Sequence, residues 1–175
     1  MRNIILVFAL LCLLNPVCAK KTKKDFFKFN QLRFKLATEN ITSAEDSDRI
    51  TITLTGSKRG SSADMVISFV GLREQITPGA KFQLTTGSIF ETGKVNVSGS
   101  VDTIINGKQR TVTADDFTQF TGAIRITKVD GDNFSFVLRS KAKDLLLDIP
   151  GLDEGLEARI TNKIKIRARV TTNLS

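Results

Sequence analysis

The chain has 175 residues, enough for one domain with a sizeable core, and its formal net charge is +8. It contains no histidine, tyrosine or tryptophan, and its two cysteines, Cys12 and Cys18, both lie near the N-terminus. This composition excludes Ser-His-Asp and Cys-His catalytic arrangements and ordinary zinc sites, and a strongly basic chain is suited to anionic partners.

Residues 1–19 have the layout of a secretory signal peptide. Arg2 precedes an apolar run from Ile4 to Leu14, and Val17-Cys18-Ala19 has the small residues of a cleavage site. At about eleven residues the apolar run is shorter than the roughly 20 residues that span a bilayer. We therefore expect an exported protein, periplasmic or extracellular, with cleavage near Ala19.

Cleavage at that point leaves residues 20–175 as a single all-β domain without cysteine, whose stability cannot depend on a disulfide. Cys18 leaves a second interpretation open, acylation as a bacterial lipoprotein. The preceding residues, Asn15-Pro16-Val17, fit the acylation motif poorly.

Alternation of apolar and polar residues predicts the first strands at residues 26–36, 49–55, 65–69, 80–84 and 95–97. In the first of these, Leu32 and Phe34 point to the core, and Arg33 and Lys35 point to the opposite face. The polar residues 40–47 are expected to form a connection. The N-terminal end of the domain therefore has a basic outer surface.

Two hairpins are predicted in the second half of the chain. Asn106-Gly107 suits a two-residue turn that needs positive φ, and it places Val101 opposite Val112. Asp130-Gly131-Asp132 marks the next turn. A three-residue loop there pairs Ile126 with Phe136 and keeps the apolar residues of both arms on one side.

The stretch from Ala158 to Thr172 alternates more regularly than any other and carries the most charge. Its apolar positions are Ile160, Ile164, Ile166, Ala168 and Val170. Its cations are Arg159, Lys163, Lys165, Arg167 and Arg169. A strand places these two sets on opposite faces, whereas a helix would scatter them. Asn162 interrupts the apolar positions where so long a strand would need to bend.

The predicted fold is all-β, an antiparallel β-sandwich or a closed β-barrel of eight to nine strands. Turn signals recur along the chain at intervals typical of such folds, and no amphipathic helical run exceeds one turn. Leu145-Leu146-Leu147 breaks the alternation and is compatible with a strand end or one helical turn. If the first and last strands are neighbours, their outward cations form one patch.

The carboxylates do not suggest catalysis. Asp115-Asp116 and the pair Asp144 with Asp148 are potential acid/base groups, but nothing in the sequence supplies the cleft and aromatic platforms that glycosidase carboxylates use. Asp130, Asp132 and Asn133 are explained by turn geometry rather than by calcium binding. We expect no enzymatic activity, no metal site and no cofactor.

The segment Thr121–Phe136, TGAIRITKVDGDNFSF, resembles the late hairpin of small exported bacterial β domains of uncharacterised function, which are often lipoproteins. The resemblance covers about an eighth of the chain and rests on general hairpin chemistry. It implies an antiparallel sandwich or barrel and no particular activity.

Two classes of function remain. The first is a non-enzymatic module that contacts a polyanion or an anionic membrane surface, without specific nucleic acid recognition. Its predicted binding residues are Arg33, Lys35, Arg159, Lys163, Lys165, Arg167 and Arg169. The alternative is a small barrel that carries an apolar ligand among its inward phenylalanines. These are Phe27, Phe34, Phe69, Phe82 and Phe136.

Overall fold

The computed structural model describes residues 24–46, 48–71, 73–85, 92–105, 107–149 and 158–174. The predicted signal peptide and its cleavage site lie outside the described residues. The strands are β1 (Phe26–Phe29), β2 (Leu32–Lys35), β3 (Ile41–Asp46), β4 (Arg49–Lys58), β5 (Ser61–Val70), β6 (Lys81–Leu84), β7 (Lys94–Ile105), β8 (Lys108–Ala114), β9 (Gln119–Asp130), β10 (Asn133–Lys143), β11 (Leu145–Asp148), β12 (Ala158–Ile160) and β13 (Ile164–Asn173). Two short 3₁₀ turns, Thr38–Asn40 and Arg73–Gln75, complete the elements, and no α-helix occurs within the described ranges. The all-β prediction is confirmed.

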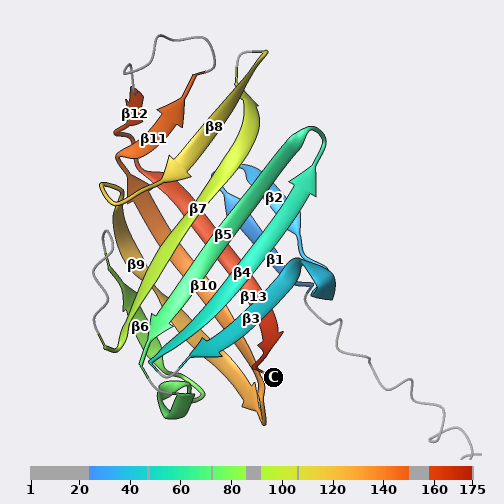
Figure 1. Cartoon of the computed structure of the whole chain (residues 1–175), viewed down its shortest axis with the longest axis vertical. Coiled ribbons are helices and arrows are strands. Elements are labelled where there is room, and N and C mark those ends of the chain that lie inside the picture. The colour runs from blue at the N-terminus through green and yellow to red at the C-terminus, as the bar shows by residue number, and fades with distance from the viewer. Residues whose placement is uncertain are drawn as a thin grey trace, which may run out of the picture.

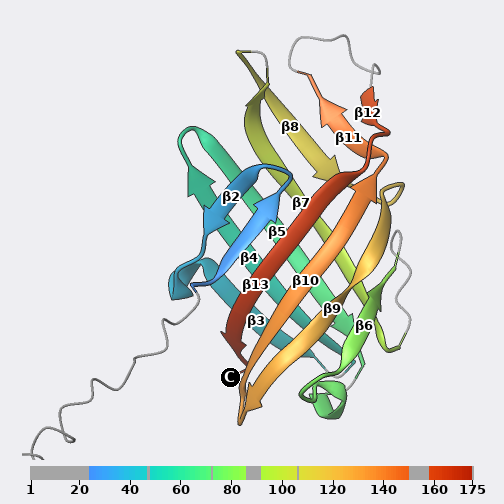
Figure 2. The ribbon, with the colours of Figure 1, turned by 180° about the vertical axis from the view of Figure 1, so that it is seen from behind.

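All 13 strands belong to one sheet. The pairing runs β2-β1-β13-β10-β9-β6-β7-β5-β4-β3. In addition, β8 pairs with residues 99–105 of β7, β11 pairs with β8, and β12 pairs with β11. Every pairing is antiparallel except that of β6 with β7. The sheet curls until β3 and β4 lie opposite β13 and β1 (Figures 1 and 2).

The sheet is not closed into a barrel, and it is not divided into two sheets. The finer expectation of a sandwich or a closed barrel with eight to nine strands therefore differs from the structure. The short β1 pairs only with residues 166–169 of β13, so it leaves the C-terminal part of that edge without a strand partner among the described residues. Side chains bridge the gap instead, including Ser43, whose hydroxyl donates to the carbonyl of Asn173.

Aromatic packing joins the two ends of the sheet. Phe27 and Phe34 are fully buried and stack with ring centroids 4.8 Å apart. A Cβ on Gly56 of β4 would lie 2.7 Å from the Cβ of Phe34, so the absence of a side chain there lets β2 approach β4. The gap is thus sealed on the inside by core contacts rather than by a backbone ladder.

Several elements differ from the sequence expectation. The predicted strand 26–36 is a hairpin that turns at Asn30, whose φ is +50°. The predicted connection 40–47 is largely strand β3, which pairs only with β4. An edge strand of this kind exposes most of its side chains and so shows no apolar alternation. The leucine run at residues 145–147 forms part of strand β11.

The predicted hairpin pairings are confirmed. Val101 lies opposite Val112, and Ile126 lies opposite Phe136. The loop between β9 and β10 has two residues rather than the expected three, because Asp130 pairs with Asn133. A bulge at Thr127 shifts the register by one residue, so that Ile126 and Phe136 lie opposite each other beyond the turn.

Candidate polyanion-binding face

The first and last parts of the chain are neighbours in the sheet. Strand β1 pairs with β13, and Lys28 lies opposite Arg167. The predicted strand 158–172 is broken at residues 161–163, around Asn162, into β12 and β13. Within β13 the alternation holds, because Ile166, Ala168 and Val170 are buried.

Twelve lysines and arginines occupy outward positions on six neighbouring strands. Two of them, Lys128 and Lys143, pair with Asp130 and Asp144. The other ten form the surface that we call the basic face. They are Lys28, Arg33, Lys35, Lys81, Arg125, Arg139, Lys141, Lys165, Arg167 and Arg169. Figure 2 shows the strands that carry them, β2, β1, β13, β10, β9 and β6, side by side. Five of these strands contain no aspartate or glutamate, and β9 contains only Asp130, at its end.

Cations on successive strands stand directly opposite one another. Lys28 pairs with Arg33 on β2 and with Arg167 on β13. Arg167 pairs in turn with Arg139 on β10, which completes a row of four cations across four strands. Neighbouring strands lie about 4.8 Å apart. Like charges at this spacing destabilise the sheet, at some tenths of a kcal/mol per pair.

Two further like-charged pairs lie beside this row. Lys141 on β10 stands opposite Lys165 on β13, and Lys81 on β6 stands opposite Arg125 on β9. The charge of the basic face is therefore repeated in two dimensions, along and across the strands.

The ion pairs found among the described residues lie at the borders of the basic face or outside it. Ion pairs join Arg73 to Glu45 and Asp132, Lys128 to Asp130, Lys143 to Asp144, and Arg159 to Asp115. Within the described ranges, no such pair includes a cation of the basic face. The guanidinium of Arg33 lies over the Phe26 ring, 4.0 Å from the ring centroid. It therefore covers the outer side of this aromatic ring.

A carboxylate borders the face at Asp25, just before β1. It accepts a hydrogen bond from the backbone N–H of Thr171 at 3.1 Å. Burial raises the pKa of the Asp25 carboxyl, and this effect outweighs the opposing effects of the Thr171 hydrogen bonds and the Arg169 charge. Asp25 is thus engaged with the β13 backbone at the margin of the face.

Of the seven predicted binding residues, five lie on the basic face: Arg33, Lys35, Lys165, Arg167 and Arg169. Lys163 is exposed in the break between β12 and β13, outside both strands. Arg159 lies on β12, which pairs with β11 rather than with the strands of the face. The structure thus places Arg159 outside the basic face, because the strand is interrupted between Ile160 and Ile164.

Arg159 has a structural role. Its guanidinium donates to both carboxylate oxygens of Asp115, at 2.8 and 3.1 Å, and to the carbonyl of Asp144 at 3.0 Å. It also lies over the Phe117 ring, 5.0 Å from the centroid. These contacts tie β12 to the β8–β9 connection and to the start of β11.

Sequence reasoning missed the other five cations: Lys28, Lys81, Arg125, Arg139 and Lys141. Each occupies an outward position of an alternating segment, so its side of the sheet was readable. The residues that lie beside each cation on neighbouring strands could not be predicted, because they depend on which strands pair and in which register. The absence of acidic residues from these segments was a second signal.

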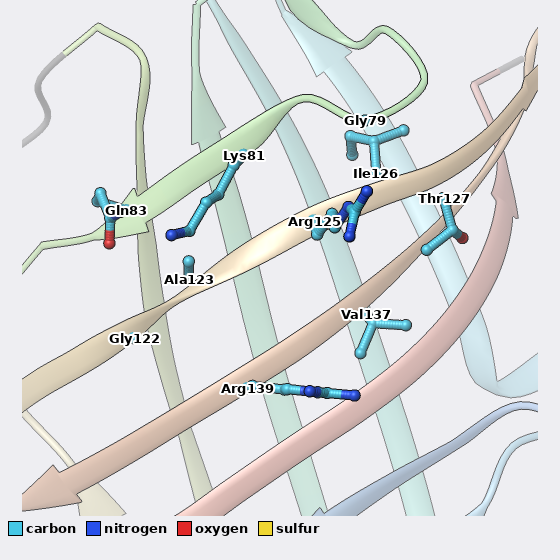
Figure 3. Close-up of a pocket in the computed structure, with 10 residues that line it drawn as sticks. All are labelled: Gly79, Lys81, Gln83, Gly122, Ala123, Arg125, Ile126, Thr127, Val137 and Arg139. Atoms are coloured by element: carbon cyan, nitrogen blue, oxygen red, sulfur yellow. The ribbon is translucent and has the colours of Figure 1, made fainter.

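A hollow opens in the basic face over β6, β9 and β10, and we call it the Gly122 hollow. It measures about 770 Å³ and is lined by Gly79, Lys81, Gln83, Gly122, Ala123, Arg125, Ile126, Thr127, Val137 and Arg139. Figure 3 shows Lys81, Arg125 and Arg139 on three adjacent strands, with the small Ala123 between Lys81 and Arg139. No residue of this lining is acidic.

Two of the sequence candidates for acid/base or calcium chemistry, Asp115 and Asp132, have structural partners. Asp115 receives hydrogen bonds from Arg159, from the Phe117 N–H and from Thr118, which close the turn between β8 and β9. The Arg159 hydrogen bonds lower the pKa of Asp115. Asp132 pairs with Arg73. A search of the described residues found no cluster of three or more metal-ligating side chains.

The inward phenylalanines pack against one another. Phe69 contacts Phe82 and Phe136 edge to face, with centroids 5.4 and 5.9 Å apart. An interior hollow lined by Phe27, Phe29 and neighbouring residues measures about 20 Å³, close to the space of one water molecule. Ligand pockets generally measure about 300–1,000 Å³. The predicted carrier function therefore gains no support from the described core.

Within the described part of the chain, no helix is long and apolar enough to cross a membrane. Comparisons with protein-family models, curated proteins and solved structures found no match to this chain. The resemblance to exported bacterial β domains therefore stays a prediction.

Proposed function

We propose that this protein is an exported, non-enzymatic binding module that contacts a linear polyanion through its basic face. The observation that carries the proposal is the row Arg33, Lys28, Arg167 and Arg139. It places four cations on four successive strands, β2, β1, β13 and β10, none of which contains an aspartate or glutamate. A partner with regularly spaced anions relieves the repulsion within this row and releases counterions on binding.

The chemistry of the face favours an acidic polysaccharide over a nucleic acid. Proteins that bind single-stranded nucleic acids without sequence preference stack bases on aromatic side chains. On the described basic face, the half-buried Phe26 is already covered by Arg33. Sulfate and carboxylate groups need cationic hydrogen-bond donors but no stacking platform.

The shape of the sheet favours a flexible chain over a membrane. The basic face lies on the outside of a curled sheet (Figure 2), so a flat bilayer would meet only part of it. The exposed large hydrophobic residues found in the described ranges, Ile104 and Phe117, lie on β7 and in the β8–β9 connection, outside the strands of the face. A linear polyanion can follow the curvature across successive strands.

Retention on immobilised heparin in a sodium chloride gradient tests this function. A variant with Lys165→Gln, Arg167→Gln and Arg169→Gln should elute at clearly lower salt than the parent. The matched control replaces Lys58, Lys108 and Arg110 with glutamine, since these residues lie on β4 and β8. It loses the same net charge and should elute close to the parent.

Equal losses in the two variants would show that only net charge matters, and the proposal would be dropped. Vesicles containing phosphatidylglycerol and a DNA duplex serve as competitors. Either competitor binding more tightly than heparin at equal salt would contradict the choice of polysaccharide.

A further inference from the structure

The Gly122 hollow is built into the backbone of β9. Gly122 adopts a φ of +131°, a conformation that other residues rarely adopt, and a Cβ at this position would overlap the carbonyl oxygen of Arg139. The next residue, Ala123, is also small, and it lies between Gln83 and Arg139 in the cross-strand register. The floor of the hollow is therefore low at Ala123, whose outward side chain is one methyl group, and Gly122 beside it contributes backbone alone.

Three cations from three strands surround this floor. Lys81 comes from β6, Arg125 from β9 and Arg139 from β10. The side chains of Gln83 and Thr127 add uncharged hydrogen-bonding groups to the lining. Such a lining suits a ligand that carries both anionic groups and hydroxyls.

The hollow is larger than a single anion requires. Its volume of about 770 Å³ lies within the range of about 300–1,000 Å³ typical of small-molecule sites. On the far side of Arg139 lies a second hollow of about 320 Å³, lined in part by Lys141, Lys165 and Arg167. Gly122 and Arg139 border both hollows, so the depression continues toward β13.

We propose that the Gly122 hollow is a subsite that seats a short segment of an acidic polysaccharide, with Lys81, Arg125 and Arg139 holding its sulfate or carboxylate groups. This inference rests on the proposed function and deepens it. It adds a shaped site, whereas a uniformly charged surface would hold the polymer at no fixed place. The chain of the polysaccharide then crosses Arg139 toward the second hollow.

Ala123→Leu tests the subsite, because it fills the hollow from the outward side without changing any charge. The matched control is Ala44→Leu, the same substitution at an exposed position of β3, outside the basic face. The probe is a heparin-derived tetrasaccharide, and titration calorimetry measures its Kd. We expect Ala123→Leu to weaken tetrasaccharide binding tenfold or more, and Ala44→Leu to leave it unchanged.

Binding of the tetrasaccharide to Ala123→Leu with the parent affinity would overturn the subsite and leave the proposed function standing. Failure of parent protein to bind either heparin or the tetrasaccharide would overturn both. If Ala123→Leu does not fold, Arg139→Gln replaces it, with Arg33→Gln as its control, because Arg33 lies at the other end of the same row and does not line the hollow. A selective loss of tetrasaccharide affinity in Arg139→Gln supports the subsite, and equal behaviour of the two variants contradicts it.

Discussion

Arg167 is one of two cations on the basic face, with Lys28, that lie opposite like charges on both neighbouring strands; its neighbours are Lys28 and Arg139. Two unit charges about 5 Å apart in water repel each other by about 0.8 kcal/mol, and salt reduces this energy. The flexible side chains can separate their charges further, so we expect roughly half of that value from each neighbour. Replacing Arg167 with glutamine should therefore raise the free energy of unfolding by about 0.5–1 kcal/mol at low ionic strength.

Urea denaturation in 10 mM and 500 mM sodium chloride measures this effect. The gain of Arg167→Gln should be largest at 10 mM and close to zero at 500 mM, where the Debye length is only about 4 Å. Lys108→Gln is the control, since the register of β7 and β8 pairs position 108 with position 105, which is not a cation. A stabilisation independent of salt, or a loss of stability at 10 mM, would refute the electrostatic reasoning.

Three further predictions concern the fold around the site. Gly56→Ala should lower the free energy of unfolding by about 1–3 kcal/mol in urea, because the new methyl group overlaps Phe34; an unchanged midpoint would contradict the packing at the gap. Gly122→Ala should cost clearly more than Gly131→Ala in the same assay, since both residues have positive φ but only the Cβ of Gly122 meets the backbone; equal costs would contradict this. Asp115→Asn should cost about 1–2 kcal/mol at pH 7, and because Arg159 lowers the folded-state pKa of Asp115, this difference should shrink as the pH falls below about 4 toward that lowered value; a difference that stays the same from pH 7 to about pH 3 would contradict the ion pair.

Local alternation was sufficient to predict which side of β13 faces the core. The buried Ile166, Ala168 and Val170 and the outward Lys165 and Arg167 of β13 follow directly from a period of two. The pairings at the two hairpins were also predictable, because apolar residues of both arms must share one face.

The turn at Asn30 was missed although the sequence contained a signal for it. The buried phenylalanines change from odd positions, Phe27 and Phe29, to an even position at Phe34, and a two-residue turn causes such a change of phase. The bulge at Thr127 was missed for a different reason. A longer loop and a short loop with a bulge give the same pairing beyond the turn, so the apolar pattern does not distinguish them.

The composition of the basic face depends on long-range pairing that a single sequence does not encode locally. Arg139 and Arg167 lie far apart in the chain and meet only because β10 pairs with β13 in one register. Arg159 illustrates the reverse case. It belongs to the same alternating stretch as Arg167, but the break at residues 161–163 places it on another part of the sheet.

The central claim is that a polyanion binds through the basic face, and nuclear magnetic resonance mapping tests it most directly. Titration of ¹⁵N-labelled protein with the heparin-derived tetrasaccharide should shift backbone amide signals of β9, β10 and β13, with the largest changes at residues 121–125 and 139–141. The amide signals of β3, β4 and β5 should stay in place. Shifts centred on β3–β5, or shifts of similar size over the whole surface, would contradict the account.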